Sequence, residues 1–194
     1  NLSDYHNSTS DIIPYYAKNH LVPFGEYKPL PIITERLYKM MDMPLADFQK
    51  GGDNQAPLTM KDQKVAFNIC YEDGFGDELI ATAKRSTLLA NISNMAWYGK
   101  SNAMYQQLQQ SQARAMELGR YMVRATNTGA TAIISPKGTI VAEAQPDTET
   151  VLEGHVKGYI GETPYMKAGG STWLISILAV IGAFLIMIGR KKSE

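Results

Sequence analysis

The chain has 194 residues, of which 44% are hydrophobic and 20% charged, a balance typical of a protein that buries a core. Lys plus Arg number 19, as do Asp plus Glu, so no net charge recruits nucleic acid. The single cysteine excludes an internal disulfide and a cysteine-rich zinc cluster, and the three histidines are too scattered to suggest a metal site. The polar opening without Met or a leader indicates a fragment of a longer protein.

The first part of the chain, residues 1–168, alternates strand-like and helix-like segments. Residues 64–70 predict a short apolar strand. A helix is expected at 77–85, where two acids come first and two bases last, the charge order that a helix dipole favours. Residues 88–93 predict the next strand.

A long helix is expected over residues 104–124, because apolar and small residues recur there every three or four positions: Leu108, Ser111, Ala115, Leu118 and Met122. Residues 131–135 and 139–144, separated by a Pro-Lys-Gly turn, predict a hairpin. Strands separated by helices, with a late hairpin, predict an α/β domain with a mixed sheet.

Residues 172–189 are apolar and uncharged, and as a helix they would span roughly 30 Å of hydrocarbon. A buried core helix is the alternative. Trp173 at one edge and the basic residues Arg190, Lys191 and Lys192 at the other are the flanks expected of a transmembrane helix. We therefore predict a transmembrane helix over 169–190 and a cytoplasmic basic tail at 191–194.

Cys70 ends a predicted strand and is followed by Gly74, Gly76 and a predicted helix. A strand-turn-helix of this kind exposes a nucleophile near backbone N–H groups that can hold an oxyanion. A lone cysteine is also commonly a small buried hydrophobic residue, so its role depends on the segments around it.

Further motifs accompany the Ile-Cys-Tyr-Glu run at 69–72. Residues 18–27 read KNHLVPFGEY, residues 91–99 read NISNMAWYG, and residues 124–129 read RATNTG. In this order the motifs resemble the nitrilase superfamily. With a single transmembrane helix and a basic tail after them, they resemble its apolipoprotein N-acyltransferase family, whereas soluble amidases of the superfamily lack that helix.

The resemblance implies an α-β-β-α sandwich, here a partial domain, with Cys70 as nucleophile. Lys18 then matches the lysine that stabilises the tetrahedral intermediate, and the backbone N–H of Tyr71 completes the oxyanion hole. Glu26 and Glu72 match acids that position Lys18 and its surroundings, although solvated loop carboxylates are an alternative. The family's general base, a Glu on an earlier strand, has no counterpart before Lys18, so the fragment is not expected to turn over alone.

Asn94 and Trp97 are candidate supporting or substrate-contacting residues, with ordinary core packing as the alternative for Trp97. Met95 stands where the family often has Asp, and we expect it to reshape a lipid-facing pocket. The resemblance implies no cofactor and no metal.

The implied activity is transfer of a fatty acyl chain from a phospholipid to Cys70, and then to the N-terminal amine of a diacylglyceryl-cysteine lipoprotein. The implied location is the bacterial inner membrane, multi-pass in the full-length protein, with the catalytic domain periplasmic. A membrane-tethered amidase or nitrilase and an inactive membrane scaffold remain as alternatives.

Overall fold

The computed structural model describes residues 14–29, 48–99 and 101–191. The predicted polar opening and most of the predicted basic tail, residues 192–194, lie outside the described residues. Among the described residues, six strands form one sheet in chain order: β1 (Leu58–Met60), β2 (Gln63–Ile69), β3 (Leu88–Ser93), β4 (Met122–Thr126), β5 (Ala132–Ile134) and β6 (Ile140–Glu143).

The centre of the sheet is parallel and its edges are antiparallel. Strands β2, β3 and β4 run parallel to one another, whereas β1 and the β5–β6 hairpin pair antiparallel. Parallel neighbours need a crossover, which α2 (Gly76–Ala83) and α3 (Ala103–Leu118) supply. The residues that follow β2, β3 and β4 therefore meet at the carboxyl ends of these strands, which we call the sheet edge below.

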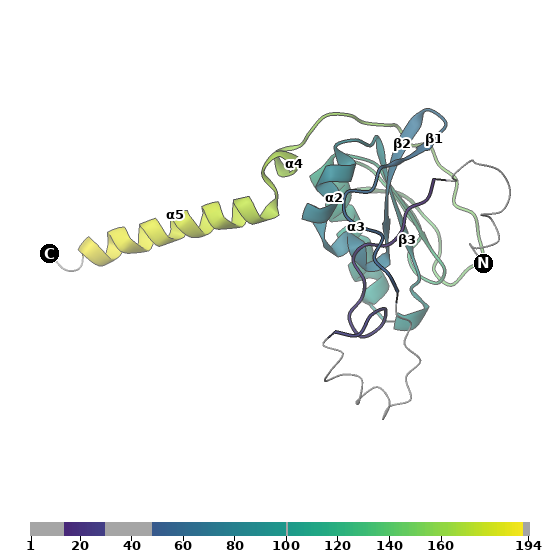
Figure 1. The fold of residues 1–194 in the computed structure, drawn as a ribbon, viewed down its shortest axis with the longest axis horizontal. Coiled ribbons are helices and arrows are strands. Elements are labelled where there is room, and N and C mark those ends of the chain that lie inside the picture. The colour runs from purple at the N-terminus through teal and green to yellow at the C-terminus, as the bar shows by residue number, and fades with distance from the viewer. Residues whose placement is uncertain (1–13, 30–47, 100, 192–194) are drawn as a thin grey trace, which may run out of the picture.

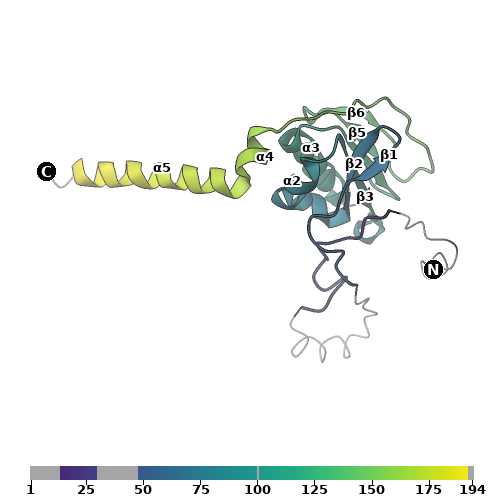
Figure 2. The ribbon, with the colours of Figure 1, turned by 45° about the horizontal axis from the view of Figure 1, so that its top comes forward.

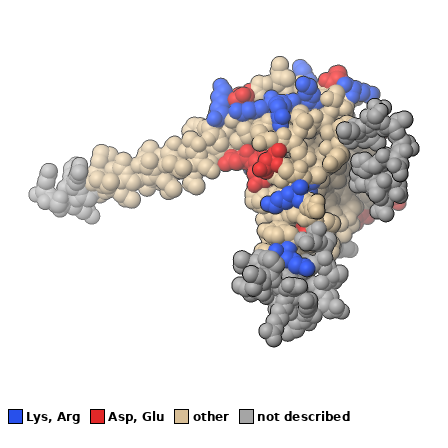
Figure 3. All heavy atoms as spheres, viewed as in Figure 1, with Lys and Arg blue, Asp and Glu red and all other residues tan. Residues whose placement is uncertain are grey.

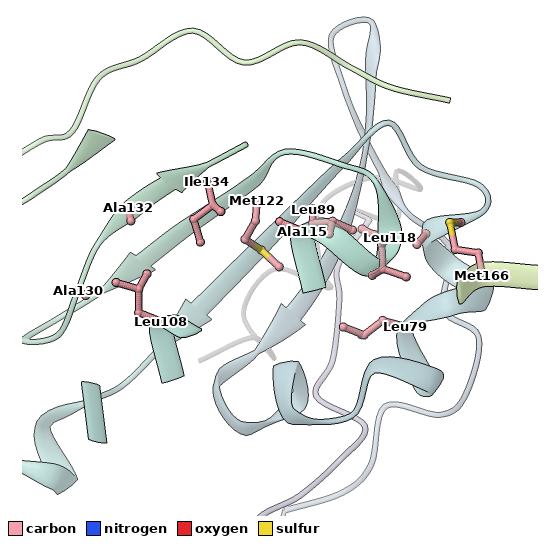
Figure 4. Close-up of a cluster of buried hydrophobic side chains, with 12 residues drawn as sticks. Leu79, Leu89, Leu108, Ala115, Leu118, Met122, Ala130, Ala132, Ile134 and Met166 are labelled. Carbon is pink, nitrogen blue, oxygen red and sulfur yellow. The ribbon is translucent and has the colours of Figure 1, made fainter. Parts of the chain in front are cut away.

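Both crossover helices lie on the same face of the sheet (Figures 1 and 2). A cluster of buried apolar side chains fills the space between the two layers (Figure 4), and its largest members are Leu79, Leu89, Leu108, Leu118, Met122, Ile134 and Met166. Met166 comes from the short helix α4 (Pro164–Ala168). The chain after β6 thus returns across the molecule and packs onto the helix layer.

The opposite face of the sheet is apolar and open among the described residues. Its exposed side chains include Met60, Ile92, Val123 and Val141, each at least 37% exposed. A shallow apolar groove crosses β1 to β4 on this face. The described residues thus make up one helix layer and one sheet layer of the predicted α-β-β-α sandwich, and the α/β class is confirmed.

The predicted strands at 64–70 and 88–93, the first helix and the late hairpin are confirmed. The predicted helix over 104–124 is wrong at its end, because α3 stops at Leu118 and residues 122–126 form β4. Gly119 takes a left-handed conformation with φ of 62°, and its N–H bonds to the carbonyls of Ala115 and Met116. This is a common way for a helix to end.

The last helix, α5 (Gly170–Lys191), projects from the rest of the molecule as a single rod (Figure 1). Its segment 170–188 has a mean hydropathy of 2.4, and none of that segment is buried against the protein. No blue or red atoms interrupt the described side chains of the rod (Figure 3). The alternative of a buried core helix is therefore wrong, and α5 is a candidate transmembrane helix.

The Asp77 carboxylate joins this helix to the helix layer of the sheet domain. Asp77 lies in the first turn of α2 and accepts hydrogen bonds from the Gly170 amide at 2.8 Å, the Tyr165 hydroxyl at 2.7 Å and the Ser171 hydroxyl at 3.2 Å. The bond from Gly170, followed by that from Tyr165, lowers the pKa of Asp77. The carboxylate is therefore ionised at neutral pH, and it caps the positive end of the α5 dipole.

We predict that Asp77→Ala in the full-length protein accelerates hydrogen–deuterium exchange in a peptide covering residues 165–172, because the Gly170 amide loses its acceptor. Glu78→Ala is the matched control, since Glu78 bonds His20 at 3.0 Å instead and should leave this peptide unchanged. Equal exchange in both variants and the wild type would contradict the role of Asp77.

Candidate active site

Residues 14–29, which we call the lysine segment, place Lys18 and Glu26 in direct contact. Lys18 Nζ lies 2.7 and 2.6 Å from the two carboxylate oxygens of Glu26. Glu26 also accepts the amide of Val22 at 2.8 Å, which fixes the turn that brings it back towards Lys18. The Lys18 side chain is 10% exposed, so water weakens this ion pair less than it weakens a pair on an open surface.

The Glu72 carboxylate joins the lysine segment to the Cys70 turn. It is 3% exposed and accepts the amides of Asn19 at 2.6 Å and His20 at 2.9 Å from the lysine segment. It also accepts the Ile69 amide at 2.6 Å, from the end of β2. The Tyr16 hydroxyl donates a fourth bond at 2.9 Å, and burial, together with the charge of Glu72, raises the pKa of Tyr16. Glu72 is therefore a buried, fully bonded carboxylate rather than a solvated one.

Cys70 occupies the first position of a 3-10 turn, η2 (Cys70–Gly74), directly after β2. Its φ of 55° lies in the left-handed region, which is costly for a residue with a Cβ. The side chain is partly exposed, and a free thiol is present. The predicted strand-turn-helix is confirmed, because α2 follows η2 after Phe75.

Aromatic rings cover the outer side of the η2 turn. The His20 ring stacks on Phe75 with a centroid distance of 3.5 Å. Tyr71 meets the same two rings edge-on, at 5.6 Å from His20 and 4.9 Å from Phe75, and remains 37% exposed. The Tyr71 side chain therefore contributes to packing between the lysine segment and the turn.

The candidates from the NISN motif lie at the same sheet edge, after β3. Asn94 Oδ1 accepts the Ala96 amide at 3.1 Å and the Asn127 side-chain amide at 2.8 Å, which links this loop to the one after β4. Trp97 is 86% exposed, so the core-packing alternative for it is wrong. Met95 is 2% exposed and its sulfur lies 3.9 Å from Nη2 of the buried Arg124, so its side chain lies beneath the surface, and its effect on a lipid-facing pocket stays a prediction.

Sequence reasoning missed a buried ion pair beneath the Cys70 turn. Arg124 Nη1 lies 3.2 Å from Asp73 Oδ2, and neither side chain is exposed. Burial raises the pKa of Asp73 to about 6, against the opposing effects of the Ser111 hydrogen bond and the Arg124 charge. Asp73 directly follows the motif at 69–72 and Arg124 begins the motif at 124–129, but only the fold shows that they meet across 51 residues of chain.

A polar cleft on the described surface lies between the lysine segment and α2, and its lining includes Tyr16, Asn19, Asp53, Asp77 and Glu78. Neither Lys18 nor Cys70 lines it. We therefore do not regard it as the site of chemistry. Within the described ranges, no group of three or more His, Cys, Asp or Glu residues is arranged to hold a metal ion.

The family model described as carbon-nitrogen hydrolase matches residues 5–165. The chain belongs to the carbon-nitrogen hydrolase family. Within the matched part lie the Lys18–Glu26 pair, the Glu72 bridge and Cys70.

Curated relatives of this carbon-nitrogen hydrolase chain share one printed name, apolipoprotein N-acyltransferase. The protein of that name from Neisseria meningitidis serogroup B is 77% identical over 194 residues, which are all of this chain and 38% of the relative. The one from Chromobacterium violaceum is 53% identical over 182 residues, covering 94% of this chain and 35% of the relative. The chain thus spans little more than a third of the length of these relatives.

Among solved structures, the C. elegans NitFhit protein matches with a TM-score of 0.49 and 20% identity. The match covers 68% of this chain and 31% of that chain, and it is too weak to add to the argument.

In this carbon-nitrogen hydrolase chain, Gly51 allows a second segment to run against the lysine segment. The Gly51 amide donates to the Lys18 carbonyl at 2.9 Å, and Gln55 bonds both the amide and the carbonyl of Ala17. A Cβ at position 51 would lie 2.3 Å from the Ala17 carbonyl oxygen and 2.6 Å from the Ala17 Cβ. Backbone next to Lys18 would have to move to admit it.

We predict that Gly51→Ala in the full-length protein lowers the rate of the reaction in which Cys70 is the nucleophile by about tenfold to a hundredfold. Small displacements of catalytic groups cost factors of this size. Gly25→Ala, in the lysine segment itself, is the matched control, since its Cβ would meet only the Val22 side chain, no closer than 3.7 Å. Equal activity of the two variants, measured as initial rates at matched protein levels, would contradict the argument.

Proposed function

We propose that this chain is the catalytic C-terminal part of an N-acyltransferase that modifies lipoproteins. The observation that carries the proposal is the joining of two features in one chain. The first feature is the site: Cys70 follows the parallel strand β2, and Glu72 bonds both the end of that strand and the segment that carries the Lys18–Glu26 pair. The second is the apolar helix α5, whose first residue bonds Asp77 at the start of α2. Both proposed substrates are lipids, so an enzyme that acts on them needs contact with a membrane.

The proposed reaction has two balanced steps. The Cys70 sulfur attacks the carbonyl carbon of a phospholipid ester, the ester C–O bond breaks, and the thiol proton ends on the lysophospholipid hydroxyl. The N-terminal amine of a diacylglyceryl-cysteine lipoprotein then attacks the thioester. An amide forms, the C–S bond breaks, and one amine proton returns to sulfur. Thioesters react readily with amines, which suits this order of steps.

Lys18 and the backbone N–H of Tyr71 would stabilise the oxyanion that forms in both steps. Glu26 holds the Lys18 ammonium through both carboxylate oxygens, and Glu72 holds the segment that carries Lys18 against the Cys70 turn. Asn94 would position the loop after β3, where the exposed Trp97 offers an apolar surface for an acyl chain. Residues 1–168 would form the C-terminal part of the catalytic domain.

A membrane-tethered amidase or nitrilase would use the same nucleophile on a small C–N substrate. It would release a free acid instead of transferring an acyl group to an amine. An inactive scaffold would have no need of an intact Lys18–Glu26 pair or of a nucleophile in a strained conformation. The acyltransferase therefore remains the proposal that accounts for both the Cys70 site and the apolar helix α5.

We predict that full-length enzyme mixed with phospholipid gains one acyl mass on the Cys70 peptide, and that a diacylglyceryl-cysteine lipopeptide removes it as an N-acylated product. Cys70→Ser should abolish both, because an alkoxide forms far less readily than a thiolate. Lys18→Arg should also fail, since a planar guanidinium does not replace a compact ammonium. Release of free fatty acid without N-acylation would favour the hydrolase, and an acyl group on another residue would overturn the assignment of Cys70.

We further propose that the protein lies in the bacterial inner membrane, multi-pass at full length, with the catalytic domain periplasmic and the end of the chain cytoplasmic. The support is the charge asymmetry around α5. Arg190, Lys191 and Lys192 follow the apolar segment directly, whereas Lys167 is the only basic residue within about eight positions before it.

We predict opposite labelling of two single cysteines placed in a Cys70→Ser background. Thr150→Cys should react with an impermeant maleimide in intact spheroplasts, and Ser193→Cys should react only after the membrane is opened. Quantifying both labels with and without permeabilisation provides the internal control. The reverse pattern would place the catalytic domain in the cytoplasm and would favour a cytoplasmic amidase.

A further inference from the structure

A cluster of buried polar side chains lies beneath the Cys70 turn, and the proposed chemistry does not yet use it. Its members come from five different elements and are at most 8% exposed: Asn68, Asp73, Asn91, Gln107, Ser111 and Arg124. Burying so many polar groups, one ion pair among them, is weak evidence of stabilisation, because apolar side chains of similar volume commonly do as well. Such a cluster therefore calls for another explanation.

Arg124 is the centre of this cluster, and each of its nitrogens donates hydrogen bonds. Nε bonds the Ala130 carbonyl at 3.1 Å, while Nη1 bonds Asn91 at 2.8 Å, Ser111 at 2.9 Å and Asp73 at 3.2 Å. Nη2 bonds Gln107 Oε1 at 2.8 Å. A guanidinium held from three sides cannot rotate, so it presents fixed donors to its neighbours.

Fixed donors determine the orientation of the two amide side chains that face Arg124. Gln107 and Asn91 each place the oxygen of the amide on the guanidinium, so the nitrogen of each must point away from it. In both cases the nitrogen points at Cys70: Gln107 Nε2 lies 3.9 Å from Cys70 Sγ, and Asn91 Nδ2 lies 3.3 Å from the Cys70 carbonyl oxygen. A flipped amide would bring its N–H groups against the Arg124 cation. The contact with Arg124 therefore decides which end of each amide is the oxygen and which is the nitrogen.

We propose that Gln107 is a catalytic residue that donates a hydrogen bond to the Cys70 sulfur, and that Arg124 is a positioning residue that aims both amides at Cys70. The proposal deepens the function proposed above and rests on it for the role of the thiolate. The sulfur is negative both when it attacks the ester and when it leaves the thioester, whereas it is neutral in the acyl-enzyme. A donor to sulfur therefore favours the thiolate over both the thiol and the thioester.

The second amide acts on the backbone of the same residue. Asn91 Nδ2 holds the Cys70 carbonyl and also bonds Asn68 Oδ1, so the left-handed conformation of Cys70 is fixed from the helix-covered face of the sheet. Glu72 fixes the residue before it through the Ile69 amide. Together these contacts hold the sulfur where Gln107 can reach it.

The test measures how the rate of iodoacetamide alkylation of Cys70 depends on pH, followed on the Cys70 peptide in the full-length protein. Gln107→Glu keeps an oxygen for Arg124 but puts a carboxylate in place of the N–H donor. We expect the pH of half-maximal alkylation to rise by about one unit, the shift that corresponds to a tenfold change in the thiol–thiolate equilibrium. Gln107→Met removes the N–H donor and the oxygen that Arg124 bonds, without adding a negative charge, so it should shift this pH in the same direction by less.

Gln106→Glu is the matched control, because Gln106 is exposed on the same helix and the substitution makes the same change in charge. The other titratable groups around the turn are Glu72, Asp73, Glu78, Arg114, Arg124 and the Lys18–Glu26 pair. A side-chain hydrogen bond from Gln107 lowers the pKa of Asp73, so both Gln107 variants remove that effect, whereas Gln106→Glu leaves it in place. Arg124→Lys should reproduce the Gln107→Met shift, since one ammonium cannot bridge both amides. If Arg124→Lys does not fold, the Gln107 variants decide the question alone.

An unchanged half-maximal pH in both Gln107 variants would overturn the proposal, and so would an equal shift in Gln106→Glu. Alkylation requires no acyl transfer, so its outcome is independent of the proposed function. If the wild type forms no acyl thioester and the shift still appears, the N-acyltransferase fails while the hydrogen bond to sulfur stands. If acyl transfer occurs without the shift, the role of Gln107 fails alone.

Discussion

The buried carboxylate of Glu72 bonds the lysine segment to the end of β2, and the arrangement of the candidate site rests on these bonds. The lysine segment contains no helix and pairs with none of the six strands, so its position depends on side-chain contacts with the sheet. Glu72 supplies the central contact by accepting two amides from that segment and one from the end of β2. Hydrogen bonds from backbone amides to an ionised group are stronger than those between neutral groups. A neutral side chain here would weaken all of them together.

The second constraint is the geometry of parallel strands. The residues that follow β2, β3 and β4 reach the same sheet edge because the three strands run in one direction. Cys70 and the loop containing Asn94 meet there, although they are distant in sequence. Side chains one step back along these strands, such as Asn91 and Arg124, face the helix layer and form the polar floor beneath Cys70. The reactive edge and its buried support thus come from the same alternation of side chains.

The sequence was informative where local chemistry sets local structure. The strands before Cys70 and through Asn91 could be predicted because they are short apolar runs that end at turn residues. The end of α3 could not, since Leu118 and Met122 keep a helical spacing across Gly119 although Met122 is buried from a strand. The Gly before an alternating run was the available signal.

The candidate site divides in the same way. A Lys followed eight residues later by Glu, and a Cys-Tyr-Glu run, are visible in the sequence, and their resemblance to a family directed attention to them. The pairing of Asp73 with Arg124 and the aim of Gln107 depend on packing between elements far apart in the chain. The exposure of Trp97 also follows from packing, because composition alone does not distinguish a core tryptophan from one on a surface.

The joint between α4 and α5 is a single residue, Gly169, with a φ of 74°. A helix of 22 residues is a lever about 33 Å long, and its angle at this joint is set by the three bonds to Asp77. The tilt of an apolar helix in a bilayer adjusts to the thickness of the hydrocarbon layer. Asp77 ties the near end of α5 to α2, the helix that begins six residues after Cys70. A thicker or thinner bilayer would therefore turn the whole sheet, and the nucleophile with it, relative to the lipid surface.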